Sequence, residues 1–354
     1  MSFFRPNIEA MEGYVPGEQP QEKGFIKLNT NENPYPPSPR VLKRIRDAVN
    51  GDLRLYPDPT AKALRETIAD VFDTKPDRVL VGNGSDDLLT IIIRSFVGPR
   101  GKAAFPTPTY SLYPTLCRIE NATAAAVPFP PDFSLPEKLA RTGAKVTFIA
   151  NPNSPSGTMI TPLELGRLAR RINGILVIDE AYVDFAEDDC MRLVARHKNV
   201  IVLRTFSKSF SLCGLRLGFA VARKELIAGM IKVKDSYNVN RLAQVAGVAA
   251  LKDIRTVRKN ADNVRKTRAR LTKALESLGW FVYPSQSNFV FARVRPPHTP
   301  EECYTELKRR KILVRYLNDG LRITVGTDAE IDALLKNLRD ICAPRAFENR
   351  RKKR

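Results

Sequence analysis

Short apolar runs alternate with amphipathic segments along the middle of the chain. The runs are almost wholly hydrophobic rather than alternating, which is typical of strands in a sheet that is covered on both faces. They lie at 78–81, 103–105, 124–127, 146–150, 175–178, 200–203 and 219–221. Between them the apolar spacing predicts helices at 85–97, 109–117, 136–141 and 162–172. This order predicts an α/β fold with a mostly parallel central sheet flanked by helices.

The two ends of the chain have other patterns. Residues 1–24 are rich in Pro, Gly and Glu and are predicted to form an extended arm, and helical patterns follow at 38–50 and 61–72. Helices are also predicted at 223–232, 240–251 and 254–278. Beyond them, strands near 280–284, 288–293, 312–316 and 321–325 alternate with helices at 300–310 and 328–340, as in a smaller α+β domain. We therefore expect an arm (1–37), a large domain (38–255), a small domain (256–342) to which the N-terminal segment contributes, and a disordered basic tail (343–354).

Polar residues follow several of the predicted strands, at the edge where open α/β sheets bind ligands. Gly84, Ser85 and Asp86 open a helix after the first strand, and the free amides there could bind an anion; a capped helix after a tight turn is the alternative. Tyr110 follows the next strand and could stack on a flat ring, or be an ordinary half-buried tyrosine. Asn153 lies in a loop that could reach a ligand oxygen or be a structural turn.

Asp179 and Lys208 each follow a buried strand. A carboxylate at the end of such a strand is costly without a cationic or hydrogen-bonding partner, and a pyridinium nitrogen would be such a partner; a solvent-facing carboxylate is the alternative. Lys208 has hydroxylated neighbours and could form a Schiff base. Ser207 and Arg216 could bind a phosphate nearby. An ordinary polar loop is the alternative for this stretch.

The composition excludes some classes of function. The net charge of +20 raises nucleic acid as a partner, but no helix-turn-helix, zinc or aromatic-basic signature accompanies it, and the last ten residues alone carry +5. Nucleic-acid binding is therefore the non-enzymatic alternative, and a solvated basic surface is favoured. Five scattered cysteines and two histidines predict no metal site and suit a reducing cytoplasm. No signal peptide or membrane-spanning run is evident.

In combination, these stretches resemble the fold-type I pyridoxal-phosphate aminotransferases, and among them they are most similar to the histidinol-phosphate aminotransferases. The resemblance covers about residues 8 to 340. The stretches that carry it are Leu28-Asn29-Thr30-Asn31-Glu32-Asn33-Pro34, Tyr56-Pro57-Asp58-Pro59, Asp179-Glu180-Ala181-Tyr182 with Phe185, Arg204-Thr205-Phe206-Ser207-Lys208, Gly214-Leu215-Arg216-Leu217-Gly218 and Leu321-Arg322-Ile323-Thr324-Val325-Gly326.

The resemblance implies a role for each candidate residue. Lys208 would hold pyridoxal 5′-phosphate as a Schiff base and carry the substrate proton, Asp179 would pair with the ring nitrogen, and Tyr182 would bind the ring hydroxyl. The other implied contacts are Tyr110 stacked on the ring; Gly84, Ser85, Asp86, Ser207 and Arg216 at the phosphate; Tyr56 reaching the phosphate in the partner subunit of a homodimer; Asn153 near the ring hydroxyl, although Ser154 stands where many relatives have asparagine; and Tyr14, Arg315 and Arg322 at the substrate.

The implied reaction is a transamination between histidinol phosphate and 2-oxoglutarate, in histidine biosynthesis. Two other reactions with the same cofactor stay open. One is an aromatic amino acid aminotransferase acting on phenylalanine or tyrosine, because a pocket for imidazole could take a phenyl ring. The other is a phosphothreonine decarboxylase.

Overall fold

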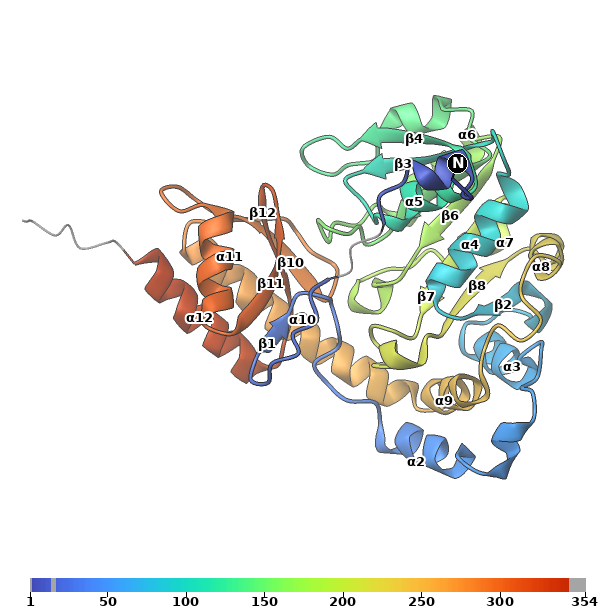
Figure 1. Ribbon diagram of the computed structural model, residues 1–354, viewed down its shortest axis with the longest axis horizontal. Helices are drawn as coiled ribbons and strands as arrows, with labels where there is room; N and C mark the ends of the chain where they lie inside the picture. Colours follow the sequence, from blue (N-terminus) through green and yellow to red (C-terminus); the bar gives the residue numbers. More distant parts are fainter. Residues whose placement is uncertain (1, 14–16, 344–354) are drawn as a thin grey trace, which may run out of the picture.

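The computed structural model describes residues 2–13 and 17–343, and these residues form two β-sheets with helices packed on them (Figure 1). The larger sheet has seven strands. Their order is β2 (Val79–Gly82), β8 (Gly218–Ala222), β7 (Val200–Thr205), β6 (Ile175–Asp179), β5 (Val146–Ala150), β3 (Lys102–Thr107) and β4 (Thr123–Pro128). All neighbours pair in parallel except those of β8, which confirms the mostly parallel sheet.

Helices cover both faces of this sheet, as the apolar strands require. The first face packs on α4 (Ser85–Phe96), α5 (Leu112–Ile119) and α8 (Lys224–Ile231). The second face packs on α2 (Pro39–Ala48), α3 (Lys62–Val71), α6 (Pro162–Arg171), α7 (Leu193–Arg196) and α9 (Arg241–Leu251). Successive strand residues alternate between the faces, so that Val177 packs on the first and Ile178 on the second. By the same alternation Asp179 belongs to the first face and Glu180 to the second.

The smaller sheet has five strands and packs on three helices. Its order is β1 (Ile26–Leu28), β11 (Ile312–Leu317), β12 (Gly320–Thr324), β10 (Phe289–Arg293) and β9 (Phe281–Val282), with α10 (Ile254–Ser277), α11 (Pro300–Arg309) and α12 (Asp328–Cys342) against it. Strand β1 pairs in parallel with β11, and in Figure 1 its blue ribbon lies among the orange and red elements. The sequence did not predict β1, because its three residues carry too little pattern to separate a strand from a turn.

Local sequence determines where several helices begin. Helix α6 has proline at its first position and a capping box in which Thr161 accepts from the Glu164 amide. Helices α11 and α12 also begin with a capping box, and α11 has proline at its first position as well. Helix α5 begins at Leu112 rather than at the predicted residue 109. Pro114 explains the shift, because proline lacks an N–H and is tolerated only in the first turn of a helix.

Two other predictions were wrong in detail. The segment expected to be an extended arm contains a short helix, α1 (Pro6–Glu9), which packs on α5, and Asn7 Nδ2 donates to the Arg118 carbonyl at 2.8 Å. The helix expected at 136–141 is a 3₁₀ turn, η3 (Glu137–Arg141). Further short turns are η1 (Gly51–Arg54), η2 (Pro76–Arg78), η4 (Val183–Phe185) and η5 (Cys213–Leu215). Within 2–13 and 17–343, no helix combines the length and hydrophobicity needed to cross a membrane.

Candidate active site

A cavity of about 420 Å³ lies where the carboxyl ends of the parallel strands meet the smaller sheet. Loops after β3, β5, β6 and β7 line one side of it, and β11, β12 and the segment after β1 line the other. The predicted residues that it brings together are Ser85, Asp86, Tyr110, Asp179, Tyr182, Ser207, Lys208, Arg216, Arg315 and Arg322. Ten residues that are scattered over the sequence thus share one cavity.

The start of helix α4 forms a cradle for an anion with Arg216. Gly84 is the N-cap residue with φ of +85°, and no side chain caps this helix within the described chain, so the first amides are left to a ligand. Arg216 donates from Nη2 to Asp86 Oδ2 at 2.9 Å and from Nη1 to Ser207 Oγ at 3.3 Å. A Cβ atom at Gly84 would lie 2.7 Å from Arg216 Nη2. The cradle therefore depends on glycine, and its donors suit a phosphate group.

Asp179 is almost fully buried at the end of β6, with 4% of its surface exposed. The Tyr113 hydroxyl donates to Asp179 Oδ2 at 2.9 Å, and the Ala181 amide donates to Oδ1 at 3.2 Å. Burial raises the pKa of Asp179 to about 6, although the hydrogen bond from Tyr113 opposes the shift. Both of these partners are neutral, so the carboxylate can still accept a cationic group that enters the cavity.

The sequence analysis missed Tyr113. Its side chain is fully buried and its ring stacks on Phe148, with centroids 4.9 Å apart and planes 12° apart. It also meets the edge of the Tyr110 ring at 5.7 Å. The available signal was its spacing of three residues from Tyr110, which places two residues on one side of a helix. That spacing says nothing about a partner on β6, which lies 66 residues away in sequence.

Lys208 lies beside Tyr182 in the cavity. Lys208 Nζ donates to the Thr30 carbonyl at 3.3 Å and lies 5.5 Å from the centre of the Tyr182 ring. The Tyr182 hydroxyl accepts from Asn31 Nδ2 at 3.1 Å. Tyr110, in turn, donates from its hydroxyl to Asp86 Oδ1 at 3.0 Å. The amine and the two tyrosines are thus fixed by contacts that reach the N-terminal segment and helix α4.

The segment after β1 supplies functional positions to which the sequence analysis gave no role. Asn29, Thr30 and Asn31 all line the cavity. Asn31 is buried with φ of +59°, its Oδ1 accepts from Thr324 Oγ1 at 3.1 Å, and its carbonyl accepts from Asn288 Nδ2 at 3.0 Å. The run of Asn and Thr directly after an apolar stretch was the signal, because such residues hydrogen-bond backbone groups and tolerate positive φ.

Two arginines enter the cavity from the smaller sheet. Arg315 and Arg322 are directly opposite each other on β11 and β12. Arg322 donates from Nη1 to Ser154 Oγ and from Nη2 to the Asn29 carbonyl, both at 3.0 Å, and its guanidinium lies 5.3 Å from the centre of the Phe289 ring. Like charges placed opposite each other destabilise a sheet. This arrangement therefore favours the binding of an anionic ligand in the cavity, beside the two arginines.

Four predicted residues are not among those described as lining the cavity: Gly84, which is the N-cap of α4 beside it, and Asn153, Tyr56 and Tyr14. The Asn153 side chain joins two loops, because it accepts from Thr109 Oγ1 in the loop after β3 at 3.1 Å and donates to Ser156 Oγ in its own loop at 3.0 Å. The next residue, Ser154, lines the cavity. Tyr56 is 76% exposed, and its ring stacks on Tyr237 with centroids 4.4 Å apart. Tyr14 lies outside the described residues. In this chain Ser154, rather than Asn153, occupies the cavity side of the loop.

The chain is similar to known proteins over nearly its whole length. Residues 23–338 match the family model for aminotransferase class I and II. The chain is 46% identical to histidinol-phosphate aminotransferase 1 of a Nostoc species, over 97% of this chain and 99% of that protein. It is 44% identical to the histidinol-phosphate aminotransferase of Geobacter sulfurreducens, over 96% and 99%. A solved structure of histidinol-phosphate aminotransferase from Sinorhizobium meliloti, in complex with pyridoxal-5′-phosphate, is similar with a TM-score of 0.89 at 26% identity, covering 97% of this chain and 98% of that one.

Proposed function

The chain belongs to the class I and II aminotransferase family, and on that premise we propose that it transfers the amino group of histidinol phosphate to 2-oxoglutarate in histidine biosynthesis. It is a pyridoxal-phosphate-dependent enzyme. The substrate is proposed because relatives of that name are similar over nearly their full length. The opposed pair Arg315 and Arg322 supports an anionic substrate in particular.

The observation that carries the proposal is the carboxylate of Asp179, which is buried in the cavity and whose hydrogen-bond partners among the described residues are the neutral Tyr113 hydroxyl and Ala181 amide. When bound, pyridoxal phosphate supplies a protonated ring that accepts electrons from the substrate α carbon. Asp179 would hold the proton on the ring nitrogen, because a carboxylate beside that nitrogen favours its charged form. The donors at the start of α4, with Ser207 and Arg216, would hold the phosphate group, so the residues present fit the cofactor.

The remaining residues of the cavity would orient the reacting groups. Tyr110 would lie against the ring face, and the Tyr182 hydroxyl, held by Asn31, would bind the ring hydroxyl. Lys208 would bind the cofactor covalently in the resting enzyme. Once substrate displaces it, its free Nζ would take the proton from the substrate α carbon and deliver it to the C4′ carbon of the cofactor, on the other side of the amine nitrogen. The position of Nζ beside Tyr182 supports this role.

Two guanidinium groups would recognise both substrates in turn. The phosphate of histidinol phosphate and a carboxylate of 2-oxoglutarate are both anions that arginine binds through paired hydrogen bonds. Arg322 is already oriented by Ser154 and Asn29, and Arg315 completes the pair. One site can therefore serve both half-reactions.

We also propose a homodimer in which Tyr56 reaches the cofactor phosphate of the partner subunit. The exposure of this aromatic ring, outside the cavity of its own chain, supports that arrangement. The cytoplasm is the proposed compartment, because the five cysteines are free. We infer no role in nucleic-acid binding for the basic surface.

A panel of amino donors tests the substrate. Histidinol phosphate, phenylalanine, tyrosine and phosphothreonine would each be mixed with the cofactor-loaded enzyme, and the half-reaction followed by the change in cofactor absorbance. We expect the kcat/KM for histidinol phosphate to exceed that for phenylalanine by at least about 100-fold, because the single charge of the phenylalanine carboxylate would pair less completely with two guanidinium groups than a doubly charged phosphate does. A kcat/KM for phenylalanine about tenfold higher than for histidinol phosphate would move the assignment to an aromatic enzyme. Release of carbon dioxide from phosphothreonine would indicate the decarboxylase.

A further inference from the structure

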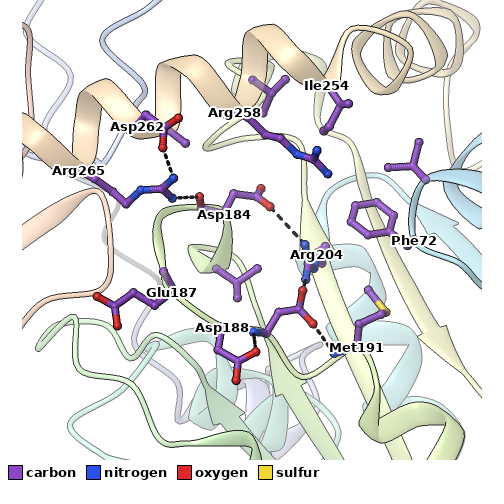
Figure 2. A pocket seen from close by; sticks show the side chains of 16 residues that line it. Phe72, Asp184, Glu187, Asp188, Met191, Arg204, Ile254, Arg258, Asp262 and Arg265 are labelled. Atoms are coloured by element: carbon purple, nitrogen blue, oxygen red, sulfur yellow. Dashed lines mark hydrogen bonds and ion pairs between the residues drawn. The ribbon is translucent and has the colours of Figure 1, made fainter.

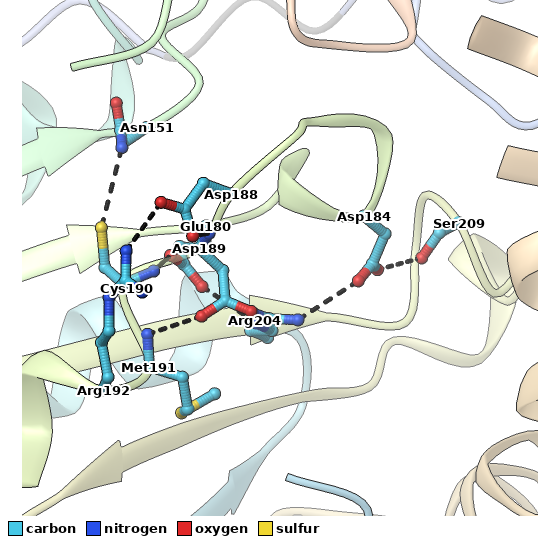
Figure 3. Close-up of polar contacts among 10 residues, drawn as sticks. All are labelled: Asn151, Glu180, Asp184, Asp188, Asp189, Cys190, Met191, Arg192, Arg204 and Ser209. Atoms are coloured by element: carbon cyan, nitrogen blue, oxygen red, sulfur yellow. Dashed lines mark hydrogen bonds and ion pairs between the residues drawn. The ribbon is translucent and has the colours of Figure 1, made fainter. Parts of the chain in front are cut away.

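A buried ion-pair cluster lies on the second face of the large sheet, behind the cavity. It consists of Arg204 with the carboxylates of Glu180, Asp184 and Asp189, and we call it the Arg204 cluster (Figure 3). Arg204 and Glu180 are both buried. The alternation of β6 and β7 places these two side chains opposite to Asp179 and Thr205, which line the cavity. The cluster is therefore not part of the site described above.

One guanidinium group makes all the ion pairs of the cluster. Arg204 Nε donates to Glu180 Oε2 at 2.9 Å, Nη1 donates to Asp184 Oδ1 at 3.2 Å, and Nη2 lies 3.1 Å from Asp189 Oδ2. The guanidinium also lies 4.9 Å from the centre of the Phe72 ring. Burial alone would lower the pKa of Arg204, but the three carboxylates raise it above its ordinary value. The group is thus a permanent cation in a fixed position.

The cluster contacts the two stretches that carry the proposed catalytic residues. Glu180 directly follows Asp179, and its Oε1 accepts from the Cys190 amide at 2.5 Å. Asp184 binds Arg204 with one carboxylate oxygen, and with the other it accepts from the hydroxyl of Ser209. Ser209 is buried and directly follows Lys208. Through Asp184, therefore, the guanidinium on β7 is tied to the loop that presents the lysine.

Asp184 is also held from the other side, by helix α10. A second cavity, of about 570 Å³, separates this helix from the cluster, and Figure 2 shows the side chains that line it. Arg265 crosses to the loop and donates from Nη1 to the Asp184 carbonyl at 3.1 Å. Asp184 and Asp189 border the cavity with 25% and 47% of their side chains exposed. Shortening either side chain would leave a space open to water rather than a sealed void, which favours folding of the variants.

We propose that Asp184 is a positioning residue for Lys208: held by Arg204 and Arg265, it fixes Ser209 and with it the backbone of the lysine loop. This inference rests on the proposed role of Lys208. The loop needs such support because Ser211, three residues after the lysine, has φ of +59°, a conformation that non-glycine residues adopt only when surrounding contacts enforce it. Asn33 supplies one such contact by donating to the Ser209 carbonyl at 3.0 Å. Asp184 supplies the contact to the side chain.

Two alanine variants separate positioning from a general effect of the cluster. Asp184→Ala and Asp189→Ala each remove one carboxylate from the same guanidinium, but Asp184 alone of the two binds Ser209. The measurement is the Kd of the cofactor-free protein for two compounds. Pyridoxal phosphate condenses with an amine, forming a C=N bond and releasing water. Pyridoxine 5′-phosphate has an alcohol in place of the aldehyde and cannot do so. The first Kd therefore reports the lysine together with the rest of the site, the second reports the rest of the site alone, and their ratio reports the lysine.

For Asp184→Ala we expect the Kd for pyridoxal phosphate to rise about tenfold, because the variant removes the hydrogen bond that the charged Asp184 carboxylate accepts from Ser209, and a hydrogen bond to a charged group is worth roughly tenfold or more in an equilibrium constant. The Kd for pyridoxine 5′-phosphate should change less than about twofold, and Asp189→Ala should leave both values near wild type. An equal rise for both compounds would overturn the proposal, as would equal effects of the two variants or no effect of Asp184→Ala. Ser209→Ala tests the same link with a smaller change, and it carries the test if Asp184→Ala does not fold.

The wild type and Lys208→Ala distinguish this proposal from the proposed function. Wild-type protein should bind pyridoxal phosphate in a form that borohydride fixes to the chain, and Lys208→Ala should not. If the wild type is not labelled, the proposed role of Lys208 fails. If it is labelled and Asp184→Ala binds both compounds as the wild type does, only the positioning role of Asp184 fails.

Discussion

Two adjacent carboxyl groups, Asp179 and Glu180, are buried on opposite faces of one sheet, and their partners differ. Asp179 faces the active-site cavity and receives hydrogen bonds from the Tyr113 hydroxyl and the Ala181 amide. Glu180 faces the other side and is paired with Arg204 at 2.9 Å. Burial raises the pKa of both groups, and for Glu180 the guanidinium opposes that effect. Glu180 is thus paired with a cation of the chain, whereas Asp179 faces a cavity.

The difference shows how a buried charge can be assigned to stability or to function. A buried carboxylate with a fixed cation is a structural pair, whose loss leaves an uncompensated charge. A buried carboxylate with only neutral partners weakens the fold by its own ionisation, and this arrangement is typical of functional sites. On this reasoning we propose that Asp179 pairs with the cationic ring nitrogen of the cofactor, whereas Glu180 stabilises the fold through its ion pair with Arg204.

The largest expected effect is on catalysis, in Asp179→Asn. The substitution keeps the shape of the side chain but removes the charge that would hold a proton on the ring nitrogen. Removing one partner of a buried charge pair costs about 3–5 kcal/mol, which corresponds to a loss of roughly 200-fold to a few thousand-fold in kcat/KM. Steady-state kinetics with histidinol phosphate would measure it. A loss below about tenfold would mean that Asp179 does not interact with the charged ring.

The matched change on the other face, Glu180→Gln, should act on stability. It leaves the Arg204 guanidinium without the best-buried of its three carboxylates. We expect the free energy of unfolding to fall by about 3 kcal/mol, because the guanidinium stays charged. Urea unfolding of the cofactor-free protein would measure this change. If Glu180→Gln unfolds at the wild-type urea concentration, then Asp184 and Asp189 are enough to compensate the charge of Arg204. Asp179 and Glu180 would then differ less than we infer.

Residues at strand ends could be predicted from the sequence, and their distant partners could not. Asp179, Lys208 and Tyr110 each follow an apolar run, so that the pattern of strands alone places them at one edge of the sheet. Tyr113 lies three residues after Tyr110, yet its hydroxyl donates to a carboxylate at the end of β6, and only the packing of α5 on the sheet brings the two together.

The same limit applies to the N-terminal segment. Strand β1 depends on pairing with β11, almost 300 residues away, and three residues hold no periodicity that would reveal it. Asn31 reaches Tyr182 only because that pairing places the following turn over the cavity. The sequence analysis noted Arg204 only as part of a family motif. Successive side chains of a strand point to opposite faces of the sheet, but the pairing of β7 with β6 is needed to see that Arg204 points away from the cavity.

The comparison also predicts an effect of pH on the cofactor-free protein. The pKa of Asp179 is about 6 in the folded protein, above its ordinary value of 3.8. The protonated carboxyl therefore stabilises the fold below pH 4, and this contribution is lost as the pH rises through about 6. The loss amounts to at most about 3 kcal/mol. Asp179→Asn cannot ionise, so at pH 7.5 it should be more stable than the wild type by up to this amount.

The difference in unfolding free energy between wild type and Asp179→Asn should shrink towards zero near pH 4. Urea unfolding at pH 4.5, 6 and 7.5 measures it, and taking the difference cancels the titration of groups common to both proteins. A difference that does not vary with pH would show that Asp179 does not change its protonation state in this range. Ionisation of Asp179 would then not weaken the fold, and Asp179 and Glu180 would not differ in the way that we infer.

The smallest expected effect comes from the hydroxyl that supports Asp179. Tyr113→Phe keeps the ring stacked on Phe148 and removes one hydrogen bond to the carboxylate. Because that bond favours the charged form, its loss should raise the pKa of Asp179 further. It should also weaken the binding of the cofactor by about 1 kcal/mol, or roughly fivefold in Kd. Tyr283→Phe is the matched control, since Tyr283 is also buried and stacked on a phenylalanine, Phe291, but directly follows β9 of the smaller sheet. If both variants weaken cofactor binding equally, the effect is one of packing. If only Tyr113→Phe does so, and the midpoint of the pH-dependent stability difference moves upward with it, the hydroxyl adjusts the pKa of Asp179, a buried carboxylate that faces a cavity and not a cation of the chain.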